Sequence, residues 1–417
     1  MIEIEEARRL ILERVLALPS ETVDLRAALG RVLAEDVLAI DDVPGFENSA
    51  MDGFAVRAAD TRGARRDSPV TLRVVDESRA GHPASTSLKS GEAIAISTGA
   101  VIPAGADAVV RVEQTTPGEG AVEICREVPP GRDVRFAGED IEKGQTVLGS
   151  GARLGPAELG VLASAGRPSV ACTWRPRVWV LTTGDELIEP AEPLRAGAVR
   201  NSNAYAISAL VEQAGAEVIG VATVRDDPER TTEAIARALE ADVVAICGGV
   251  SVGVHDHVRG ALSALDVEEV FWRIALKPGK PAWFGRRRAG GQPDAEREPG
   301  GQRGTLVFGL PGNPVSAMVT FTLLVRPALL ALSGEPPAPR RTTARLERDY
   351  EKSPGRAHAV RCRLELGEDG WHATPAEHQG SHVSTSMLGA DALAIIPTES
   401  GTVHAGEQVE IELLPYG

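Results

Sequence analysis

The chain has 417 residues, of which 43% are hydrophobic and 25% are charged, and its formal net charge is −15. This length exceeds what one hydrophobic core usually supports, so the sequence predicts two to four domains. The acidic balance argues against a general nucleic-acid binder, although a single anionic ligand would respond to the local charge rather than to the total.

The composition also indicates a compartment. Four cysteines stand far apart without a Cys-x-x-Cys pair, which is typical of buried thiols in a reducing cytoplasm rather than of disulfides or a zinc site. No uninterrupted apolar run reaches the roughly 20 residues that a membrane helix needs. The acidic, helical start of the chain does not resemble a signal peptide. We therefore expect a cytoplasmic protein that binds neither membranes nor nucleic acid.

The first part of the chain predicts one unit inserted into another. Apolar residues within 3–18 recur on one stripe, which predicts an amphipathic helix, and residues 22–40 predict a short helix followed by a strand. Between about 70 and 132, short strands alternate with glycine and proline turns, and the pattern then returns to loop and helix. We predict an inserted β-rich domain at 41–132 within a helical or extended linker domain at 1–40 and 133–170.

The second part of the chain predicts an α/β domain followed by a β domain. From 171 to 334, near-continuous apolar strands alternate with helices, which indicates a parallel-rich sheet covered on both faces. The polar, glycine-rich residues 286–304 predict a hairpin excursion within it. Residues 335–417 predict a small, barrel-like β domain. The predicted fold class is therefore a multidomain α/β plus β protein.

The stretch 271–318 carries the strongest chemical signal. It predicts a strand, a Lys-Pro-Gly-Lys turn, two further strands and a Pro-Gly-Asn-Pro corner that opens a helix. Asn313 suits the N-cap and Pro314 the first helical position, so the free amides of that helix would point out of the end of the sheet. Together with Lys277 and Lys280, they predict a receptor for phosphate or a metal oxyanion.

Acidic and glycine-rich loops follow the other predicted strands of this sheet. In α/β sheets, ligands bind beyond the carboxyl ends of the strands, so we expect these loops to meet. Mg²⁺ favours one or two carboxylates plus phosphate oxygens, which predicts a magnesium-dependent phosphate site. The side chains that these loops supply are Asp185, Glu186, Asp226, Asp227 (which also suits a helix N-cap), Ser251 and Asp256.

The same loops allow two other interpretations. The string Gly-Val-Ser-Val-Gly at 249–253 fits a hydrolase nucleophile elbow with Ser251 as the nucleophile. That alternative stays open, although no oxyanion-hole loop of the His-Gly-Gly-Gly kind precedes it. His255 and His257 suggest a metal pair, but side chains two residues apart at a helix start do not face one another.

Seven ordered motifs give the chain a specific resemblance over almost its whole length. They are ENSAMDGFAVR, STGAVIPAGADAVV, AGEDIEKGQ, LTTGDELIEP, GGVSVGVHDHV, LKPGKPAWFG and GLPGNPVSAM. In this order they resemble the molybdopterin molybdenumtransferase family, the MoeA-type enzymes related to the E domain of gephyrin. The resemblance implies an elongated four-domain homodimer with a molybdopterin-binding α/β domain. It also implies that adenylylated molybdopterin and molybdate react to give molybdenum cofactor and AMP, assisted by Mg²⁺.

The resemblance also places functional residues by motif position. Members of the family set Asp52 and Thr98 of one subunit against the α/β domain of the other, which implies a homodimer. Combined with the loops above, the predicted catalytic set is Asp52, Thr98, Asp140, Glu186, Asp226, Asp256, Lys277 and Lys280, and the predicted metal set is Glu186, Asp226 and Asp256. The predicted substrate-binding set is Gly248, Gly249, Ser251, Gly253, Arg273, Pro311, Gly312, Asn313, Pro314, Ser381 and Ser386.

Three positions depart from the pattern of the family. Arg273 stands where many relatives have lysine, Asn201 replaces an aspartate, and Asp391 stands where an Ala-Asn pair is usual. An arginine keeps the charge of lysine but changes its geometry. None of the three removes a charged group that the reaction needs, so we expect an active enzyme.

Other functions stay open at this point. One is the adenylyltransferase that makes the adenylylated substrate, although the domains outside the α/β unit argue against it. That adenylyltransferase is instead a candidate partner in the same pathway. Another is a gephyrin-like scaffold that binds peptides. A third is a tungstate-preferring variant of the same enzyme, because molybdate and tungstate have nearly the same size and charge.

Overall fold

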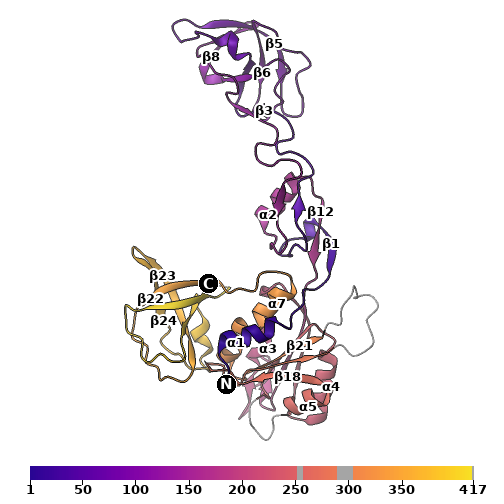
Figure 1. The fold of residues 1–417 in the computed structure, drawn as a ribbon, viewed down its shortest axis with the longest axis vertical. Coiled ribbons are helices and arrows are strands. Elements are labelled where there is room, and N and C mark those ends of the chain that lie inside the picture. Colours follow the sequence, from indigo (N-terminus) through magenta and orange to yellow (C-terminus); the bar gives the residue numbers. More distant parts are fainter. Residues whose placement is uncertain (251–256, 289–303, 416–417) are drawn as a thin grey trace.

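The structure is a computed structural model that describes residues 1–250, 257–288 and 304–415. Figure 1 shows an elongated molecule with a β unit at one end, a narrow connecting unit, and two broader units side by side at the other end. The chain begins at the broad end, runs out to the far unit and returns. The distal unit is therefore an insertion held away from the rest of the chain.

The distal unit is a six-stranded mixed sheet with hydrophobic side chains on both faces. The strand order is β7-β4-β6-β5-β9-β8, and only β5 and β6 pair in parallel within it. Val56 and Val122 belong to one buried cluster, whereas Ile94 and Val109 belong to another. The predicted β-rich character is thus confirmed. Its elements are β3 (Asn48–Ser49), β4 (Gly53–Val56), η2 (Ala58–Thr61), β5 (Val70–Ser78), β6 (Glu92–Ile96), β7 (Ala108–Arg111), η3 (Val112–Gln114), β8 (Thr115–Gly118), β9 (Ala121–Ile124) and β10 (Val134–Arg135).

The connecting unit consists of two short antiparallel pairs and one helix. β1 (Ser20–Asp24) pairs with β12 (Ser169–Thr173), and β2 (Val37–Leu38) pairs with β11 (Thr146–Leu148). The helix α2 (Pro156–Ser164) has a proline at its first position. The predicted short helix within residues 22–40 is a single 3-10 turn, η1 (Leu25–Ala27), capped by the carboxylate of Asp24, and the predicted strand is β2. The first residues of that range belong to β1.

The α/β unit contains a six-stranded sheet in the order β16-β13-β17-β21-β20-β18. The first four strands are parallel, whereas β20 runs antiparallel to both of its neighbours. β17 and β21 are buried along their whole length, which accounts for their uninterrupted apolar sequences. The strands are β13 (Arg177–Thr183), β16 (Glu217–Val224), β17 (Val243–Cys247), β18 (Val267–Trp272), β20 (Trp283–Arg287) and β21 (Thr305–Leu310), with a parallel pair β14 (Leu187–Ile188) and β15 (Val199–Arg200) in a protruding loop.

Helices cover both faces of this sheet. α4 (Pro228–Ala238) and α5 (Val258–Ala264) pack on one face, and α3 (Ser202–Gln213) packs on the other with a long composite helix. That helix runs from α6 (Pro314–Thr320) through a π-helical turn, η4 (Phe321–Val325), into α7 (Arg326–Leu332).

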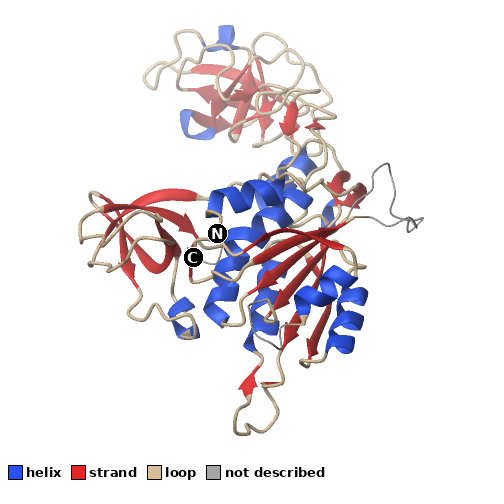
Figure 2. Cartoon of the chain, turned by 60° about the horizontal axis from the view of Figure 1, so that its bottom comes forward, coloured by secondary structure: helices blue, strands red, loops and turns tan. Residues whose placement is uncertain are grey.

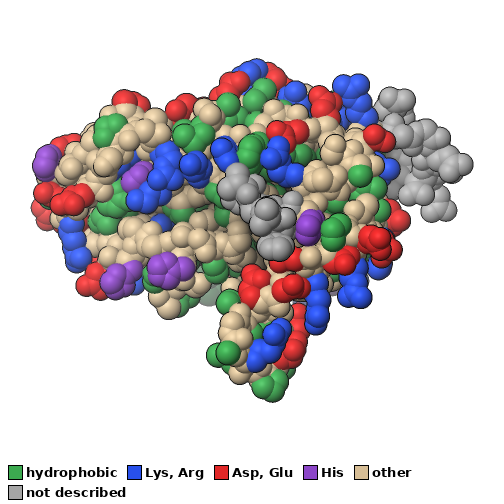
Figure 3. Space-filling view, turned by 90° about the horizontal axis from the view of Figure 1, so that it is seen from below, with side chains coloured by type: hydrophobic (Ala, Val, Ile, Leu, Met, Phe, Trp, Pro, Cys, Tyr) green, Lys and Arg blue, Asp and Glu red, His purple; other side chains and the backbone are tan. Residues whose placement is uncertain are grey.

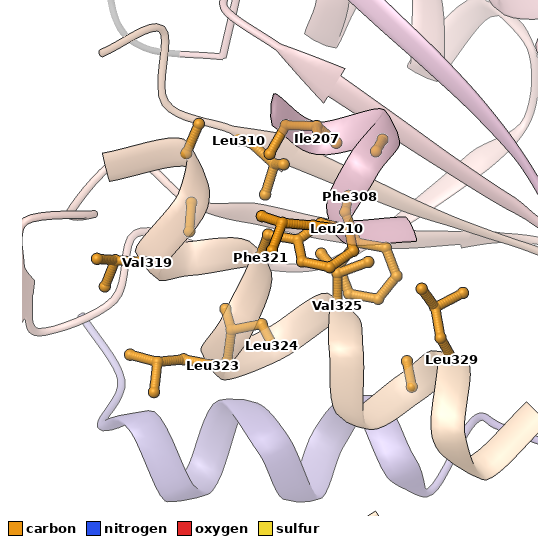
Figure 4. Packing of buried hydrophobic residues seen from close by; sticks show 14 of the residues in the cluster. Ile207, Leu210, Phe308, Leu310, Val319, Phe321, Leu323, Leu324, Val325 and Leu329 are labelled. Carbon is orange, nitrogen blue, oxygen red and sulfur yellow. The ribbon is translucent and has the colours of Figure 1, made fainter. Parts of the chain in front are cut away.

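The composite helix forms the centre of the larger core. In Figure 4, Phe321 and Val325 from η4 and Leu329 from α7 lie close to Leu210 of α3 and Phe308 of β21. The stretch Pro314–Leu332 is also long and apolar enough to cross a membrane, with a mean hydropathy of 1.9. However, 83% of its most apolar window is buried inside the protein, as in the core helix of a globular unit.

The C-terminal unit is a small closed barrel. β23 pairs with both β24 and β25, and the order β23-β24-β22-β26-β25 returns to its start. Figure 2 shows this barrel beside the α/β unit. One further strand, β19 (Leu276–Lys277), belongs in sequence to the α/β unit but pairs with β23. The barrel contains β22 (Arg341–Leu346), β23 (Ala357–Gly367), β24 (Gly370–Pro375), η5 (Ser384–Met387), β25 (Ala392–Ile396) and β26 (Gln408–Leu413).

The first helix ties the barrel to the α/β unit. α1 (Ile4–Leu12) is shorter than the predicted span 3–18, and the chain then runs to Leu18, whose amide donates to the carbonyl of Leu332 at 2.8 Å. Arg8 of α1 is buried and donates two hydrogen bonds of 2.6 Å to the carboxylate of Glu412 in β26. Arg8 also donates to the carbonyl of Leu323 at 2.9 Å, so one guanidinium joins α1, η4 and the barrel.

We expect Glu412→Gln to lower the free energy of unfolding by about 3 kcal/mol, because it removes the buried carboxylate shared by Arg8 and Arg341 and leaves Arg8 only the exposed carboxylate of Glu5. Denaturant unfolding followed by circular dichroism measures this loss. Glu365→Gln is the matched control, since Glu365 lies exposed on β23 and has no ion pair within the described residues. Equal stability of the two variants would contradict the assignment of the Arg8–Glu412 pair as a structural tie.

Candidate functional site

The loops predicted to carry chemistry meet at one edge of the α/β sheet. β16, β13, β17 and β21 are parallel, so their carboxyl ends lie at the same edge. β18 runs in the same direction, because it is antiparallel to β20 and β20 is antiparallel to β21. The Lys-Pro-Gly-Lys turn that follows β18 therefore lies at this edge as well. We call it the carboxyl edge.

Two acidic loops lie side by side at the carboxyl edge. The amide of Asp226 donates to a carboxylate oxygen of Asp185 at 3.4 Å, and the amide of Gly184 donates to the carbonyl of Val224 at 3.1 Å. The carboxylate of Glu186 folds back over Gly184, where a Cβ would lie 2.4 Å from its nearest oxygen. The loops after β13 and β16 thus bring three carboxylates into one region.

Asp227 has a different role from its neighbour. Its carboxylate accepts a hydrogen bond of 2.8 Å from the amide of Arg230 and caps α4, and Pro228 occupies the first helical position. The predicted N-cap is therefore confirmed. Because a carboxylate committed to a cap is held by its own helix, Asp226 rather than Asp227 is the acid that this loop offers to a ligand.

Glycines allow the neighbouring loops to approach one another closely. Gly248 has a φ of +93°, and a Cβ there would lie 2.9 Å from both the carbonyl oxygen and the hydroxyl of Thr183. The amide of Gly248 donates to the carbonyl of Leu310 at 3.0 Å, which brings it beside Gly312 of the next loop. Gly249 also has a positive φ, of +64°. Only glycine fits such a position without strain and without a collision.

The lysine turn lies at the boundary between the α/β unit and the barrel. Lys277 is paired in register with His358 of β23, so its backbone belongs to the sheet of the barrel. Lys280 is exposed, and neither lysine forms an ion pair with any residue in the described parts of the chain. Arg273 stands just before this turn with a φ of +71°, and its guanidinium stacks 3.8 Å from the centre of the Trp272 ring.

The Pro-Gly-Asn-Pro corner contacts the C-terminal unit. Pro314 starts α6 as predicted, but the side chain of Asn313 does not cap the helix and donates instead to the hydroxyl of Ser381 at 3.0 Å. The amide of Val315 donates to the carbonyl of Ser381 at 3.2 Å. Asn313 thus occupies the predicted N-cap position, but its side chain is directed toward Ser381 and makes no capping hydrogen bond. The proximity of Ser381 to the corner could not be read from the sequence.

Arg361 is a buried residue of this region that the sequence interpretation missed. It is 1% exposed, and its guanidinium donates to the hydroxyl of Ser386 and to the carbonyls of His378 and Gly380 at 3.3 to 3.4 Å. Burial lowers the pKa of Arg361. Its signal in the sequence is a single arginine inside the otherwise apolar strand segment from Ala359 to Cys362. Arg361 therefore positions the loop that carries Ser381 and Ser386.

Asn203 is a second missed residue. Its side-chain amide donates to the carbonyl of Gly312 at 2.7 Å and so fixes the Pro-Gly-Asn-Pro corner from the start of α3. The side-chain oxygen of Asn203 and the hydroxyl of Thr183 are both buried without a hydrogen-bond partner among the described residues. Unpaired buried polar atoms are costly, so their presence at the carboxyl edge indicates a place where a ligand adds hydrogen bonds.

The departures from the family's pattern have different structural settings. The side-chain amide of Asn201 donates to the hydroxyls of Thr182 and Thr223 at 2.8 and 2.9 Å, while its oxygen accepts from the amide of Ala204 and caps α3. An aspartate there could accept but not donate. Asp391 accepts a hydrogen bond from the amide of Leu364 within the barrel, remote from the carboxyl edge.

The remaining predicted residues lie elsewhere. The carboxylate of Asp52 accepts hydrogen bonds from the amide and the hydroxyl of Thr98 at 2.7 and 3.0 Å, so these two are neighbours. They belong to the distal unit, which Figure 1 shows far from β18 and β21. Asp140 is exposed and lies between β10 of the distal unit and β11 of the connecting unit. One chain therefore does not bring Asp52 and Thr98 to the carboxyl edge.

Part of the predicted site lies outside the described residues, namely Ser251, Gly253 and Asp256. Within the described ranges, no group of three or more His, Cys, Asp or Glu side chains is arranged to hold a metal ion. Glu186 and Asp226 nonetheless offer hard oxygen donors on adjacent loops. This donor set fits Mg²⁺, which needs only one or two carboxylates when phosphate oxygens complete its shell.

The mixed α/β sheet, the distal β unit, the connecting unit and the closed barrel together match one known class of protein. Family models match the chain in three consecutive parts: the MoeA N-terminal region, domains I and II, over residues 2–166; the probable molybdopterin binding domain over 179–331; and the MoeA C-terminal region, domain IV, over 343–414. The first match covers the distal unit and most of the connecting unit, the second covers the α/β unit, and the third covers the barrel.

Full-length relatives agree with these matches. The chain is 37% identical to the molybdopterin molybdenumtransferase of Haemophilus influenzae, covering 99% of this chain and 98% of the relative. It is 36% identical to molybdopterin molybdenumtransferase 2 of Mycobacterium tuberculosis, covering 99% of each. A crystal structure of the molybdopterin biosynthesis MoeA protein from Pyrococcus horikoshii superimposes with a TM-score of 0.82 at 32% identity, covering 99% of this chain and all of the other. The chain belongs to the MoeA family of molybdopterin molybdenumtransferases.

We expect Gly248→Ala to lower the free energy of unfolding by about 2 kcal/mol, because alanine is strained at this φ and its methyl group meets Thr183. Gly260→Ala is the matched control, since Gly260 lies in α5 and a Cβ there meets nothing within 4 Å. The control should gain up to about 1 kcal/mol from helix propensity. Denaturant unfolding of the two variants should therefore shift in opposite directions, and a parallel shift would contradict the close approach at Gly248.

Proposed function

We propose that the protein inserts molybdenum into adenylylated molybdopterin, forming molybdenum cofactor and releasing AMP. The observation that carries this proposal is the meeting of acidic, glycine-rich and lysine-bearing loops at the carboxyl edge. The named relatives, which match along the entire chain, support the same reaction. Their full-length coverage favours insertion over adenylyl transfer and over a peptide-binding scaffold, because the distal unit and the barrel are part of the match.

The proposed reaction depends on positioning of the substrate and on electrostatic stabilisation by this site. Gly248, Gly249 and the corner at 311–314 would hold the substrate through backbone groups that lie close together at the edge. Lys277 and Lys280 would offset the charge of the molybdate and of the departing phosphate. Because neither lysine is neutralised by an ion pair within the described residues, both charges remain available to an anion.

The acidic loops are proposed to serve the adenylyl end of the substrate. Glu186 and Asp226, with Asp256 of the predicted set, would hold Mg²⁺ there. When bound, the ion would supply Lewis-acid polarisation of the phosphoanhydride. The proposal assigns this role to Asp226 because its loop lies against that of Asp185, whereas the carboxylate of its neighbour Asp227 caps α4.

We also propose that the active form is a homodimer. Asp52 and Thr98 lie at the distal unit of the chain and cannot reach its own carboxyl edge, so a second copy would have to present them. Phe46, Met51 and Phe136 flank the β3–β10 strand pair of this unit and are exposed at 49%, 38% and 50%. Large exposed apolar side chains in one region are typical of an interaction surface. The cytoplasmic location and a handover from the adenylyltransferase stay predictions of the family resemblance.

We expect Asp226→Asn to reduce AMP release from adenylylated molybdopterin, molybdate and Mg²⁺ by about a hundredfold, because it removes a carboxylate beside the reacting phosphate. Asp227→Asn is the control, since it makes the same chemical change one residue away and asparagine still caps a helix. Release of AMP is measured by chromatography after single turnover, with the thermal midpoint as a check on folding. A wild-type protein that releases no AMP beyond the molybdate-free rate would refute the proposed function.

We expect two inactive variants to complement one another if the site is shared between subunits. Asp52→Asn and Glu186→Gln should each abolish AMP release alone. In a dimer of one subunit of each kind, one site carries both substitutions and the other carries neither. Unfolding and refolding an equimolar mixture should therefore restore about a quarter of the wild-type activity. Mixed samples as inactive as the single variants would contradict the shared site.

A further inference from the structure

A positively charged pocket lies at the mouth of the C-terminal barrel. It has a volume of about 500 Å³ and lies where β19 joins β23. The nitrogen-bearing side chains that line it are Lys277, Lys352, Arg356 and His358. Figure 3, a view from below, shows lysine and arginine side chains gathered on the half of the molecule that the barrel occupies.

The positive side chains of this pocket outnumber the acids near them, which are the lining residue Glu351 and Glu399, whose charge acts on Lys352. Among its described lining residues, Glu351 is the one acid. Lys352 is 7% exposed and donates to the carbonyls of Thr398 and Ser400 at 3.2 and 2.7 Å, so backbone groups rather than a carboxylate hold its ammonium. Lys277 and Arg356 form no ion pair within the described parts of the chain. Buried or enclosed positive charge without a carboxylate is costly unless an anion supplies the balance.

The positive groups are close enough to influence one another. His358 is 5% exposed, and its Nδ1 lies 3.0 Å from the hydroxyl of Tyr350. Burial, and then the charges of Lys277, Lys352 and Arg356, lower the pKa of His358 to about 4, so the imidazole is neutral at pH 7. Burial also lowers the pKa of Lys352. The pocket therefore holds a positive potential that is already in place before a ligand binds.

This pocket is separate from the Ser381 loop at the carboxyl edge. His358 and Arg361 are three positions apart on β23, so their side chains point to opposite faces of the strand. Arg361 faces the loop with Ser386, and His358 faces the pocket. Lys277 is the residue that the pocket shares with the lysine turn. An anion held here would thus lie directly behind the turn that the proposed reaction uses.

We propose that this pocket binds a tetrahedral dianionic oxyanion and holds it next to Lys277. The identity of the physiological ion rests on the proposed function, which would make it molybdate waiting outside the reaction site. The same chemistry would accept a phosphate group from a substrate. Arg356 supplies a planar, permanently charged donor for such oxygens, and His358 supplies a neutral ring that can take up a proton when an anion binds. The volume exceeds that of one such ion, which therefore enters with part of its hydration.

Equilibrium dialysis of the purified full chain against molybdate tests the pocket without any pterin. We expect the wild type to bind molybdate and Arg356→Gln to bind it roughly tenfold or more weakly, because a charge-assisted hydrogen bond is lost. Arg66→Gln is the matched control, since Arg66 is exposed in the distal unit and makes the same change of charge. Superimposable isotherms for Arg356→Gln and Arg66→Gln would overturn the proposal.

Two further arms make the outcome specific. Arg356→Lys keeps the charge and should recover most of the affinity for molybdate. If Arg356→Gln lost affinity only because it failed to fold, restoring the charge would not account for such a recovery. Competition with inorganic phosphate separates the two sources: strong competition assigns the pocket to phosphate groups, and weak competition assigns it to molybdate.

If Arg356→Gln loses molybdate while AMP release is absent even in the wild type, the pocket stands and the proposed reaction falls. In an active enzyme, Arg356→Gln should raise the KM for molybdate and leave kcat within about twofold.

Discussion

The parallel alignment of β16, β13, β17 and β21 is the constraint on which the rest of this structure depends. It forces the loops after these strands to one edge, although the first and last of them lie more than a hundred residues apart in sequence. The central position of β17 and β21 is maintained because both strands are buried on both faces, so that moving either of them to an edge would expose apolar side chains. The closeness of Asp185, Glu186, Asp226 and Gly248 is thus a consequence of burial rather than of interactions among the site residues themselves.

The barrel completes the carboxyl edge because it is fixed to the α/β unit at several points. β19 lends two residues to the barrel sheet, Asn313 donates to Ser381, and Arg8 joins α1 to Glu412. These ties differ in kind, since one is a backbone pairing, one a neutral hydrogen bond and one a buried ion pair. Together they set the position of Lys277, which lies between the lysine turn and the pocket of the barrel. A shift of the barrel would therefore alter the charge that both regions present to an anion.

Sequence patterns predicted the fold class, the parallel-rich sheet and the loops that follow its strands, because periodicity and glycine positions report local structure. They also predicted Asp227 as a cap and Pro314 as a helix start, which are local features too. The failures concern long-range partners. Nothing near Asn313 indicates that Ser381 will take its amide, and a strand as short as β19 has no pattern of its own. Arg361 was missed because the apolar segment around it indicates a strand but not which loop its guanidinium holds.

Because the molecule is elongated, the proposed shared site requires accurate placement of residues that lie far from the α/β unit of their own chain. Asp52 and Thr98 are held to one another by two hydrogen bonds within the small distal sheet, so their mutual geometry is independent of the other units. Their position relative to a carboxyl edge depends instead on the connecting unit, whose strand pairs are short and whose hydrophobic cluster is small. Such a connection tolerates bending, because few buried contacts oppose it. Placing Asp52 accurately therefore requires a rigid contact made by the distal unit itself. The exposed ring of Phe46 and its apolar neighbours are suited to provide that contact, since burial against a second copy would replace the stiffness that the connecting unit lacks.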